Sequence, residues 1–248
     1  MRVLVVGAGA TGGYFGGRLA EAGRDVTFLV RPRRAAQLAA DGLVIRSPHG
    51  DATLPAPRTV LAEKISAPFD LILLSCKAYD LDGAIDAFAP AVGPATVILP
   101  LLNGMRHLDV LDARFGRERV LAGQCIIAAT LDERGVIVHM NDNHSLTFGE
   151  RDGGTSERVR AIAAAMSGTR FELRLSDAAV QEMWEKWVVL AALAGSTCLM
   201  RAAIGDIVAA PAGEDVIAAI FADCRTIATA NGHAPRQAFV ERAMATLT

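Results

Sequence analysis

The sequence has few cysteines, and no two of them are close together. They form neither a CxxC pair nor a dense group along the 248 residues: Cys76, Cys125, Cys198 and Cys224. A disulfide framework of the kind that stabilises small secreted domains is therefore not expected. We predict a protein of the reducing cytoplasm.

Hydrophobic runs of membrane-spanning length are also missing. The longest run, Trp187 to Met200, is about 14 residues, whereas a helix needs about 20 to cross a bilayer, so we predict a buried core helix there. The first residues, MRVLVVGAGATGG, place one arginine before an apolar run, but no small-residue cleavage site follows. A formal net charge of -2 provides no general attraction to nucleic acid or anionic membranes, and neither is expected as a partner.

The histidines do not form a metal-binding pattern. Only His139 and His144 are close in sequence, and they lie on either side of the polar residues Asn141 to Asn143. We interpret this polar stretch as a hairpin turn with ordinary surface histidines beside it. The sequence therefore predicts no metal site.

What the sequence does contain is enough apolar material for one large or two modest domains, since 52% of its residues are hydrophobic. In the first part, short β-rich runs alternate with helical stretches, a pattern typical of a parallel sheet with helices on both faces. The predicted strands are 2–6, 25–30, 70–75 and 96–99, and the predicted helical stretches are 18–22, 35–40 and 81–88.

Later segments complete a first domain and begin a second. We predict a hairpin in 43–54, an antiparallel edge from Val120 that closes the first domain, a helix over 157–166 and a last strand over 171–175. After Asp177 helical periodicity continues through 178–206, 214–231 and 236–247, with a break at Pro211 and Gly213 and a left-handed C-cap at Asn231-Gly232. The predicted fold is α/β: a Rossmann-type doubly wound sheet in residues 1–176, then an all-helical domain in residues 177–248.

The strongest local motif is a GxGxxG pattern directly after the first strand and directly before a helix. It consists of Gly7, Ala8, Gly9, Ala10, Thr11 and Gly12. In this context the first glycine permits a tight turn, the second lets the backbone approach a pyrophosphate, and the third allows close packing of helix on strand. The helix N-terminus would attract the pyrophosphate. The sequence therefore predicts a dinucleotide site.

The residue at the end of the second strand indicates which dinucleotide binds. NAD sites usually have an acidic residue there to hold the ribose hydroxyls, but this sequence has Arg31, and Asp25 lies at the opposite end of that strand. A guanidinium holds a 2′-phosphate through paired hydrogen bonds. The alternative is a basic, solvated helix start. We predict NADP(H).

Several further segments match one known family in order. They are SCKAYD at 75–80, LLNGM at 101–105, GQCIIAA at 123–129 and EMWEKW at 182–187, which follow the glycine-rich GAGATGGYFGGRLAEAG. With these segments the chain resembles the ketopantoate reductase (2-dehydropantoate 2-reductase) family over nearly its whole length. The resemblance implies NADPH-dependent reduction of a 2-oxo acid to a 2-hydroxy acid, in pantothenate biosynthesis, with substrate held between the two domains.

The resemblance also implies roles for individual residues. Asn103 would contact both the nicotinamide ribose and the substrate, Lys77 would line the cofactor site, and Ala129 would contact the cofactor through its backbone. Lys186 would bind the substrate and donate the proton, because hydride delivery leaves negative charge on oxygen that an ammonium group can stabilise. The structural alternatives are a loop-capping asparagine, a solvated lysine and a Glu182–Lys186 surface pair.

The sequence departs from the family pattern in two places. Leu190 and Ala194 occupy the positions, four and eight residues after Lys186, where the best-studied branch has asparagines. An apolar wall disfavours a buried hydroxyl, so a bulkier or more apolar oxo acid is expected. The sequence ends at Thr248, before a serine-rich segment and a glutamate-bearing helix of the family. We expect either that these groups lie beyond the sequence given or that this member does without them.

Two alternatives to the reductase remain open. One is an NADP(H)-binding sensor that has lost turnover. The other is a dehydrogenase of the 3-hydroxyacyl or 6-phosphogluconate type, against which SCKAYD and LLNGM argue. We also expect a homodimer, because Gly16-Gly17 and the alanine-rich second domain allow close helix packing.

Overall fold

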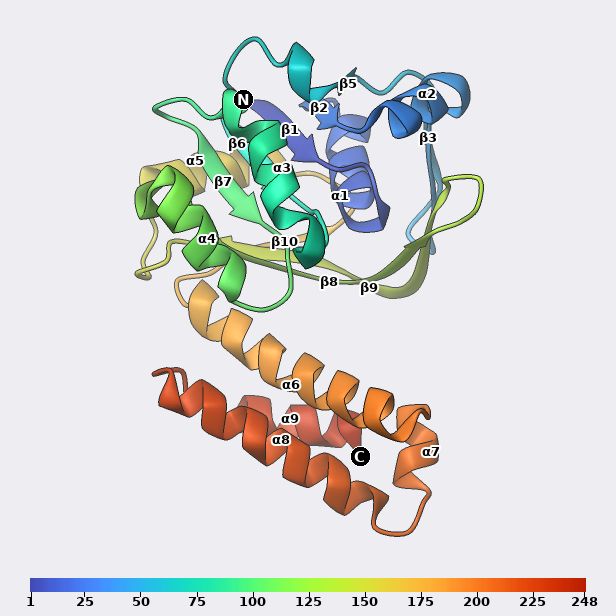
Figure 1. Ribbon diagram of the computed structural model, residues 1–248, viewed down its shortest axis with the longest axis vertical. Coiled ribbons are helices and arrows are strands. Elements are labelled where there is room, and N and C mark those ends of the chain that lie inside the picture. The colour runs from blue at the N-terminus through green and yellow to red at the C-terminus, as the bar shows by residue number, and fades with distance from the viewer. The chain divides into compact units, whose positions relative to one another are not determined.

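The computed structural model describes residues 1–248, and these divide into two compact units. The first comprises Met1–Ala179 and the second Val180–Thr248. The sequence placed the boundary between residues 176 and 177. The first unit contains helices and strands, and the second contains helices (Figure 1).

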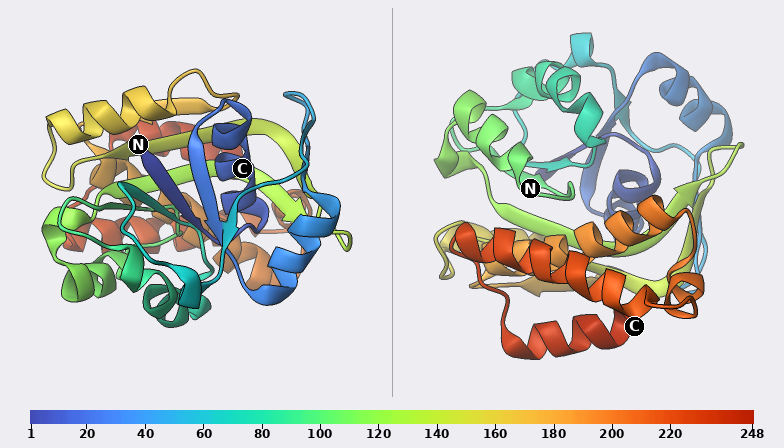
Figure 2. Two further views of the ribbon diagram at one scale, coloured as in Figure 1. Left: turned by 90° about the horizontal axis from the view of Figure 1, so that it is seen from above. Right: turned by 60° about the horizontal axis from the view of Figure 1, so that its bottom comes forward.

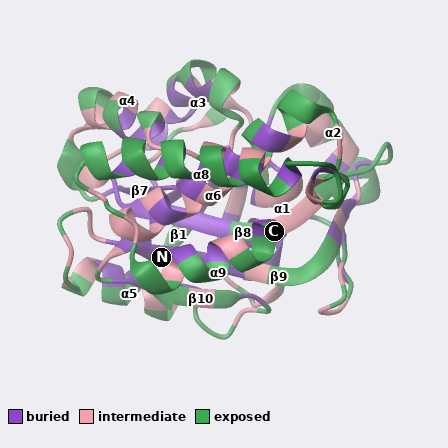
Figure 3. Ribbon diagram, turned by 90° about the horizontal axis from the view of Figure 1, so that it is seen from below, coloured by how far each residue is buried: buried purple, intermediate pink, exposed green.

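The first unit is built on a parallel sheet with the strand order β5-β2-β1-β6-β7. Its strands are β1 (Arg2–Val6), β2 (Asp25–Leu29), β5 (Thr59–Val60), β6 (Leu71–Leu74) and β7 (Val97–Pro100). Val3–Val6 of β1 and all of β6 are continuous runs of buried Val, Leu and Ile, as expected where helices cover both faces (Figures 2 and 3). The predicted doubly wound sheet is therefore confirmed, although the two-residue β5 was too short to be recognised from the sequence.

Four of the five helices of the first unit overlap the predicted helical stretches, whereas the helix over 106–115 was not predicted. The five are α1 (Ala10–Glu21), α2 (Pro32–Asp41), α3 (Leu81–Phe88), α4 (Arg106–Phe115) and α5 (Glu157–Met166). The glycines of α1 have a different role from the one expected. A Cβ on Gly16 would lie 2.7 Å from Phe28 of the first sheet, and one on Gly17 would lie 2.8 Å from Ile45 of a second sheet. These glycines let α1 lie between two sheets, rather than against another helix.

The antiparallel pairing predicted after Val120 is present, but its place was wrong, because this segment belongs to a separate second sheet and is not an edge of the first. That sheet has the order β10-β9-β3-β4, with β8 paired to β9. Its strands are β3 (Leu43–Arg46), β4 (Ala52–Leu54), β8 (Ala122–Leu131), β9 (Ile137–Gly149) and β10 (Glu172–Leu175). The predicted 43–54 hairpin thus supplies two of its strands. Local patterns do not show which sheet a strand joins, since that depends on long-range pairing.

The polar residues Asn141 to Asn143 do not form a hairpin turn. The turn lies between Leu131 and Ile137, and the polar residues lie within β9, in a register shift where Ile127 pairs with His144 and Ala129 pairs with His139. This is a β-bulge, in which extra residues on one strand leave the ladder without ending it. A bulge and a turn share polar composition, so the sequence did not distinguish them.

The histidines beside the bulge are packed together rather than scattered on the surface. The rings of His49 and His144 stack with centroids 3.7 Å apart, and the His139 ring lies 5.6 Å from that of His144. His49 and His139 donate from Nε2 to the bulge carbonyls of Asp142 and Asn143, at 3.0 and 2.9 Å. Burial, together with the other two imidazoles, lowers the pKa of His144. His49 and His139 therefore satisfy backbone carbonyl groups of the bulge.

The second unit is helical. It contains most of α6 (Ala179–Met200), and α7 (Ile204–Val208), α8 (Gly213–Ala230) and α9 (Gln237–Leu247). The predicted helix over 178–206 is interrupted where Arg201 adopts a φ of 52°. Gly232 takes the predicted left-handed conformation with a φ of 84°, but Asn231 has a φ of -90°. The predicted burial through Met200 is also wrong at the end of α6, where Leu199 is 71% exposed.

One ion pair ties α6 to the start of α9. Glu185 is buried, and its carboxylate accepts hydrogen bonds from Nε and Nη2 of Arg236 at 2.8 and 2.5 Å. The backbone N–H of Arg236 donates to the same carboxylate at 2.9 Å. A paired, fully hydrogen-bonded carboxylate avoids the cost of burying a lone charge.

No helix in the chain combines the length and apolar character needed to cross a bilayer.

A buried histidine makes the stability of the first unit depend on pH. His107 in α4 is 4% exposed, its Nε2 has no hydrogen-bond partner, and burial followed by the charge of Arg151 lowers its pKa to about 4. Because the unfolded pKa is 6.5, the neutral ring stabilises the fold above that pH, and this stability is lost as pH falls from 6.5 towards 4. We expect a loss of about 3 kcal/mol, at 1.36 kcal/mol per pKa unit.

Urea unfolding of the wild type and of His107→Phe between pH 7 and pH 4 tests this. The phenylalanine keeps the ring volume without a titrating group, so its stability should fall less steeply over this interval. Equal slopes for the two proteins would contradict the assignment to His107.

Candidate functional site

Four predicted site segments follow four adjacent strands of the first sheet. Arg31 follows β2, the Gly7–Gly12 loop follows β1, Lys77 follows β6 and Asn103 follows β7. Since all four strands are parallel (Figure 1), the strand order places these segments along one edge in the order Arg31, glycine loop, Lys77, Asn103. In open α/β sheets this carboxyl edge is where ligands bind.

The glycine loop has the geometry that a diphosphate requires. Gly7 has a φ of 94°, which an L side chain rarely adopts, and its N–H donates to the Leu29 carbonyl at 3.0 Å. A Cβ on Gly12 would lie 2.0 Å from Ser75 Oγ and 2.4 Å from the Gly7 carbonyl oxygen, so this helix start packs tightly on the sheet. A Cβ on Gly9 would meet nothing within 4 Å, so the space in front of the helix is open. The loop therefore fits an anion at the start of α1.

The remaining residues of the loop have different exposures. Ala8 is buried, whereas Ala10 and Thr11 are half-buried at the beginning of α1. Gly9 is the N-cap of that helix, and no side chain caps it. Backbone N–H groups at such an uncapped start are available to bind a ligand.

The arginines of the RPRR segment differ in their environments. The Arg31 side chain is 80% exposed, and its Nη2 lies 3.0 Å from Oδ1 of Asp80. Arg34 is half-buried, and it donates to the Ala8 carbonyl at 3.1 Å, to the Gly135 carbonyl at 3.1 Å and to Gln37 Oε1 at 2.6 Å. Arg34 thus connects the glycine loop to the β8–β9 turn, and only Arg31 and the exposed Arg33 are directed at solvent.

Lys77 and Asn103 are both exposed at the carboxyl edge. Lys77 is the N-cap of the short 3₁₀ helix Ala78–Asp80, and Asn103 precedes Gly104, which has a φ of 81°. Cys76 directly precedes Lys77, and burial and the Asp80 carboxylate raise the pKa of its thiol to about 11. Its thiol stays protonated near neutral pH and is not a nucleophile there.

Ala129 lies apart from that edge, on β8 of the second sheet. It is half-buried and pairs with His139 on the hairpin side of the bulge. The register shift leaves backbone groups next to it outside the regular ladder.

Lys186 lies on α6 in the second unit and is half-buried. Its neighbour Glu185 is held by Arg236, as described above. Trp184 and Trp187 have ring centroids 5.4 Å apart and pack against the core of that unit. Leu190 is half-buried and Ala194 exposed. At intervals of four residues these side chains follow Lys186 along one face of the helix.

Sequence reasoning missed three groups that shape the site. Asp80 lies within the SCKAYD motif but had no assigned role, Arg34 was grouped with Arg31, and Glu185 was hidden inside EMWEKW. Each acts through a partner that is distant in sequence: the spacings are 49 residues for Arg31–Asp80, 26 for Arg34–Ala8 and 51 for Glu185–Arg236. In the sequence, the only indication of these three roles was a charged residue within a motif.

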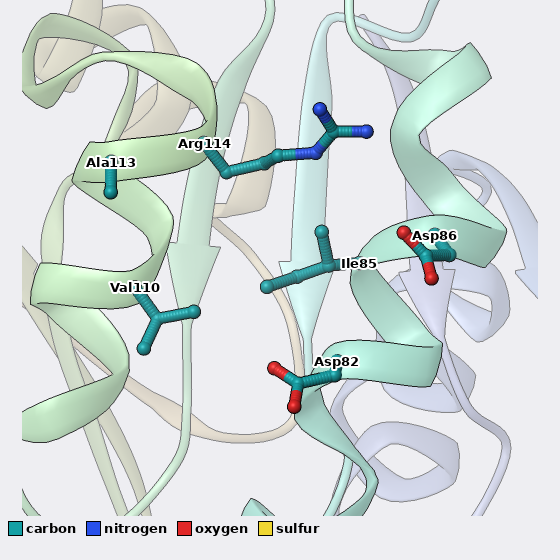
Figure 4. A pocket seen from close by; sticks show the side chains of 6 residues that line it. All are labelled: Asp82, Ile85, Asp86, Val110, Ala113 and Arg114. Atoms are coloured by element: carbon teal, nitrogen blue, oxygen red, sulfur yellow. The ribbon is translucent and has the colours of Figure 1, made fainter.

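A separate hollow of about 310 Å³ lies between α3 and α4. Ile85 and Val110 approach each other across it, and Arg114 extends from α4 towards α3 (Figure 4). Its other lining residues are Asp82, Asp86 and Ala113. None of the predicted cofactor residues lines this hollow.

The chain has no group of three or more His, Cys, Asp or Glu side chains placed to hold a metal ion.

Comparison with known proteins identifies relatives over the whole chain. Residues 3–153 match the family model described as ketopantoate reductase PanE/ApbA, and residues 178–248 match its C-terminal model. A Bacillus subtilis protein described as uncharacterized oxidoreductase YkpB is 40% identical over 100% of this chain and 81% of its own length. A 2-dehydropantoate 2-reductase of Halobacterium salinarum is 30% identical, over 98% of this chain and 80% of its own.

Solved structures show the same fold. The 2-dehydropantoate 2-reductase of Geobacter metallireducens superimposes with a TM-score of 0.89 at 27% identity, covering 100% of this chain and 82% of that one. A D-mandelate dehydrogenase solved with NADH and anilino(oxo)acetate superimposes with a TM-score of 0.86, covering 100% of this chain and 78% of that one. At 21% identity this second likeness concerns the fold alone.

Proposed function

Because this chain belongs to the ketopantoate reductase family of oxidoreductases, we propose that it reduces a 2-oxo acid to the 2-hydroxy acid with NADPH. The observation that carries the proposal is the row of Arg31, the glycine loop, Lys77 and Asn103 along the carboxyl ends of adjacent parallel strands. A relative with 30% identity is named 2-dehydropantoate 2-reductase.

The residues of the first unit fit a bound dinucleotide. The open space at Gly9 and the tight packing at Gly12 suit a diphosphate at the start of α1, and Arg31 is exposed beside it for a 2′-phosphate. Lys77 and Asn103 would hold the nicotinamide half further along the edge, and Ala129 would contribute a backbone group. The cofactor supplies a hydride equivalent to the carbonyl carbon.

Lys186 would complete the reaction on the substrate oxygen. As the carbonyl carbon gains the hydride, its oxygen gains negative charge, and an ammonium group beside it lowers the energy of that charge. Transfer of one proton from Lys186 Nζ to this oxygen then yields the 2-hydroxy acid and a neutral amine, which regains its proton from solvent. Asn103 would orient the substrate by hydrogen bonding.

The substrate is proposed to be more apolar than ketopantoate. Leu190 and Ala194 follow Lys186 on its helix and offer no hydrogen bond to a substrate hydroxyl. A hydroxyl group buried without a partner costs about 1–3 kcal/mol, which is about 5- to 150-fold in binding. We therefore expect kcat/KM to be at least about fivefold higher for 3,3-dimethyl-2-oxobutanoate, which is ketopantoate without its hydroxyl group.

The test follows NADPH oxidation by its absorbance with these two acids and a panel of other 2-oxo acids. Preference for the deoxy acid supports the apolar site, whereas preference for ketopantoate would contradict it and leave the reductase intact. NADPH binding without turnover of any oxo acid would contradict the reductase and favour a cofactor-binding sensor.

A further inference from the structure

We infer that Asp80 and Arg31 form a cofactor selector with which the site accepts both NADH and NADPH. Asp80 would accept hydrogen bonds from the adenosine ribose hydroxyls of NADH, and Arg31 would donate to the 2′-phosphate of NADPH. The inference rests on the proposed nicotinamide site and adds a second cofactor to it.

The pair is placed across the glycine loop. Arg31 follows β2 and Asp80 follows β6, and these strands lie on either side of β1. The contact between Nη2 and Oδ1 at 3.0 Å therefore joins the two strand ends that flank the start of the loop. A carboxylate and a guanidinium are thus both beside the place where an adenosine ribose lies in a Rossmann site.

Asp80 supplies the group that this chain lacks at the end of β2. NAD sites use a carboxylate there because it accepts hydrogen bonds from both ribose hydroxyls. Asp25, the acid on β2, lies at the opposite end and is paired with Arg58 at 2.6 Å. The neighbouring strand end provides the carboxylate instead.

The two side chains favour different cofactors. A carboxylate accepts from hydroxyl groups but repels a phosphate, since both are negatively charged. A guanidinium binds the phosphate through several N–H groups and gains much less from neutral hydroxyls. Because the two groups neutralise each other when paired, neither cofactor is rejected by an unpaired charge.

The pair is free to rearrange when a cofactor binds. The Arg31 and Asp80 side chains are 80% and 38% exposed, and an exposed ion pair contributes little to folding stability. Arg34 differs, because it is half-buried and its three hydrogen bonds hold it to the glycine loop, the β8–β9 turn and Gln37. The selector is therefore Arg31 with Asp80, and Arg34 positions the loop.

The dissociation constants of NADH and NADPH for the full chain test the inference without any turnover. We expect the wild type to bind both cofactors with dissociation constants within about tenfold of each other. Asp80→Asn should weaken NADH about tenfold and strengthen NADPH a few-fold, while Arg31→Gln should weaken NADPH about tenfold or more and change NADH less than about threefold.

Asp51→Asn is the matched control, since Asp51 pairs with Arg46 at 2.7 Å in another exposed ion pair of the same unit. It should change neither constant. Equal weakening of both cofactors by Asp80→Asn would mean a merely structural pair and overturn the inference, as would a wild type that binds NADPH alone. Failure of the wild type to bind either cofactor would instead contradict the proposed function from which the inference starts.

Discussion

Replacing Lys186 by alanine is expected to lower kcat for 2-oxo acid reduction about 1,000-fold. The loss combines the missing proton donor with the missing charge beside the carbonyl oxygen; each contributes about 100-fold or more in enzymes that use them, and the two effects overlap because one ammonium group supplies both. The dissociation constant of NADPH should stay within about twofold, because Lys186 lies in the second unit and the dinucleotide residues lie in the first. Steady-state kinetics and a binding titration measure the two quantities.

Lys64→Ala is the control for this substitution. Lys64 is an exposed lysine in a short 3₁₀ helix of the first unit, outside the predicted site, and its removal should leave kcat unchanged. Wild-type turnover by Lys186→Ala would show that another group supplies the proton. Circular dichroism distinguishes lost chemistry from lost folding, since Lys186 neighbours the Glu185–Arg236 pair.

A methyl group at Gly12 is expected to damage both folding and cofactor binding. Its Cβ would lie 2.0 Å from Ser75 Oγ and 2.4 Å from the backbone oxygen of Gly7, and the backbone atom cannot rotate away. Such overpacking costs about 1–3 kcal/mol of unfolding free energy. Displacing the loop also removes charge-assisted hydrogen bonds to the diphosphate, so the dissociation constant of NADPH should rise on the order of 100-fold.

Substitutions at two other glycines distinguish the effect of Gly12→Ala on folding from its effect on NADPH binding. A Cβ on Gly9 meets nothing within 4 Å, so Gly9→Ala should keep the unfolding free energy but weaken NADPH, because the methyl group enters the space left for the diphosphate. Gly205→Ala, in α7 of the second unit, also meets nothing within 4 Å and should change neither property. A dissociation constant for Gly9→Ala equal to that of the wild type would contradict the placement of the diphosphate.

Most of the secondary structure was predictable because it depends on local pattern. The strand Arg2–Val6 and the helices Leu81–Phe88 and Glu157–Met166 begin and end at the predicted residues. Runs of β-branched and apolar residues bounded by glycine, or apolar residues at helical spacing, determine such elements largely by themselves. The glycine loop was predictable for the same reason, since Gly7, Gly9 and Gly12 act within six residues of chain.

The errors fall where one composition serves two structures. Asn141 to Asn143 would suit a turn as well as the bulge that they form, and Gly16-Gly17 would suit a helix–helix contact as well as the contact between α1 and two sheets. In each case the partner strands, distant in sequence, decide the outcome. The prediction of ordinary surface histidines was wrong for the same reason, because a bulge, unlike a turn, brings His139 and His144 together with His49.

The sequence by itself determined an α/β unit with a GxGxxG loop, a helical second unit and membership of an oxidoreductase family, because short-range spacing and the order of motifs carry that information. Only the tertiary structure decided that Val120 onwards forms a second sheet, that Arg34 fixes the glycine loop and that Asp80 pairs with Arg31. These features depend on contacts between residues far apart along the chain. Such contacts are selected by the packing of the whole unit, and no local pattern encodes them.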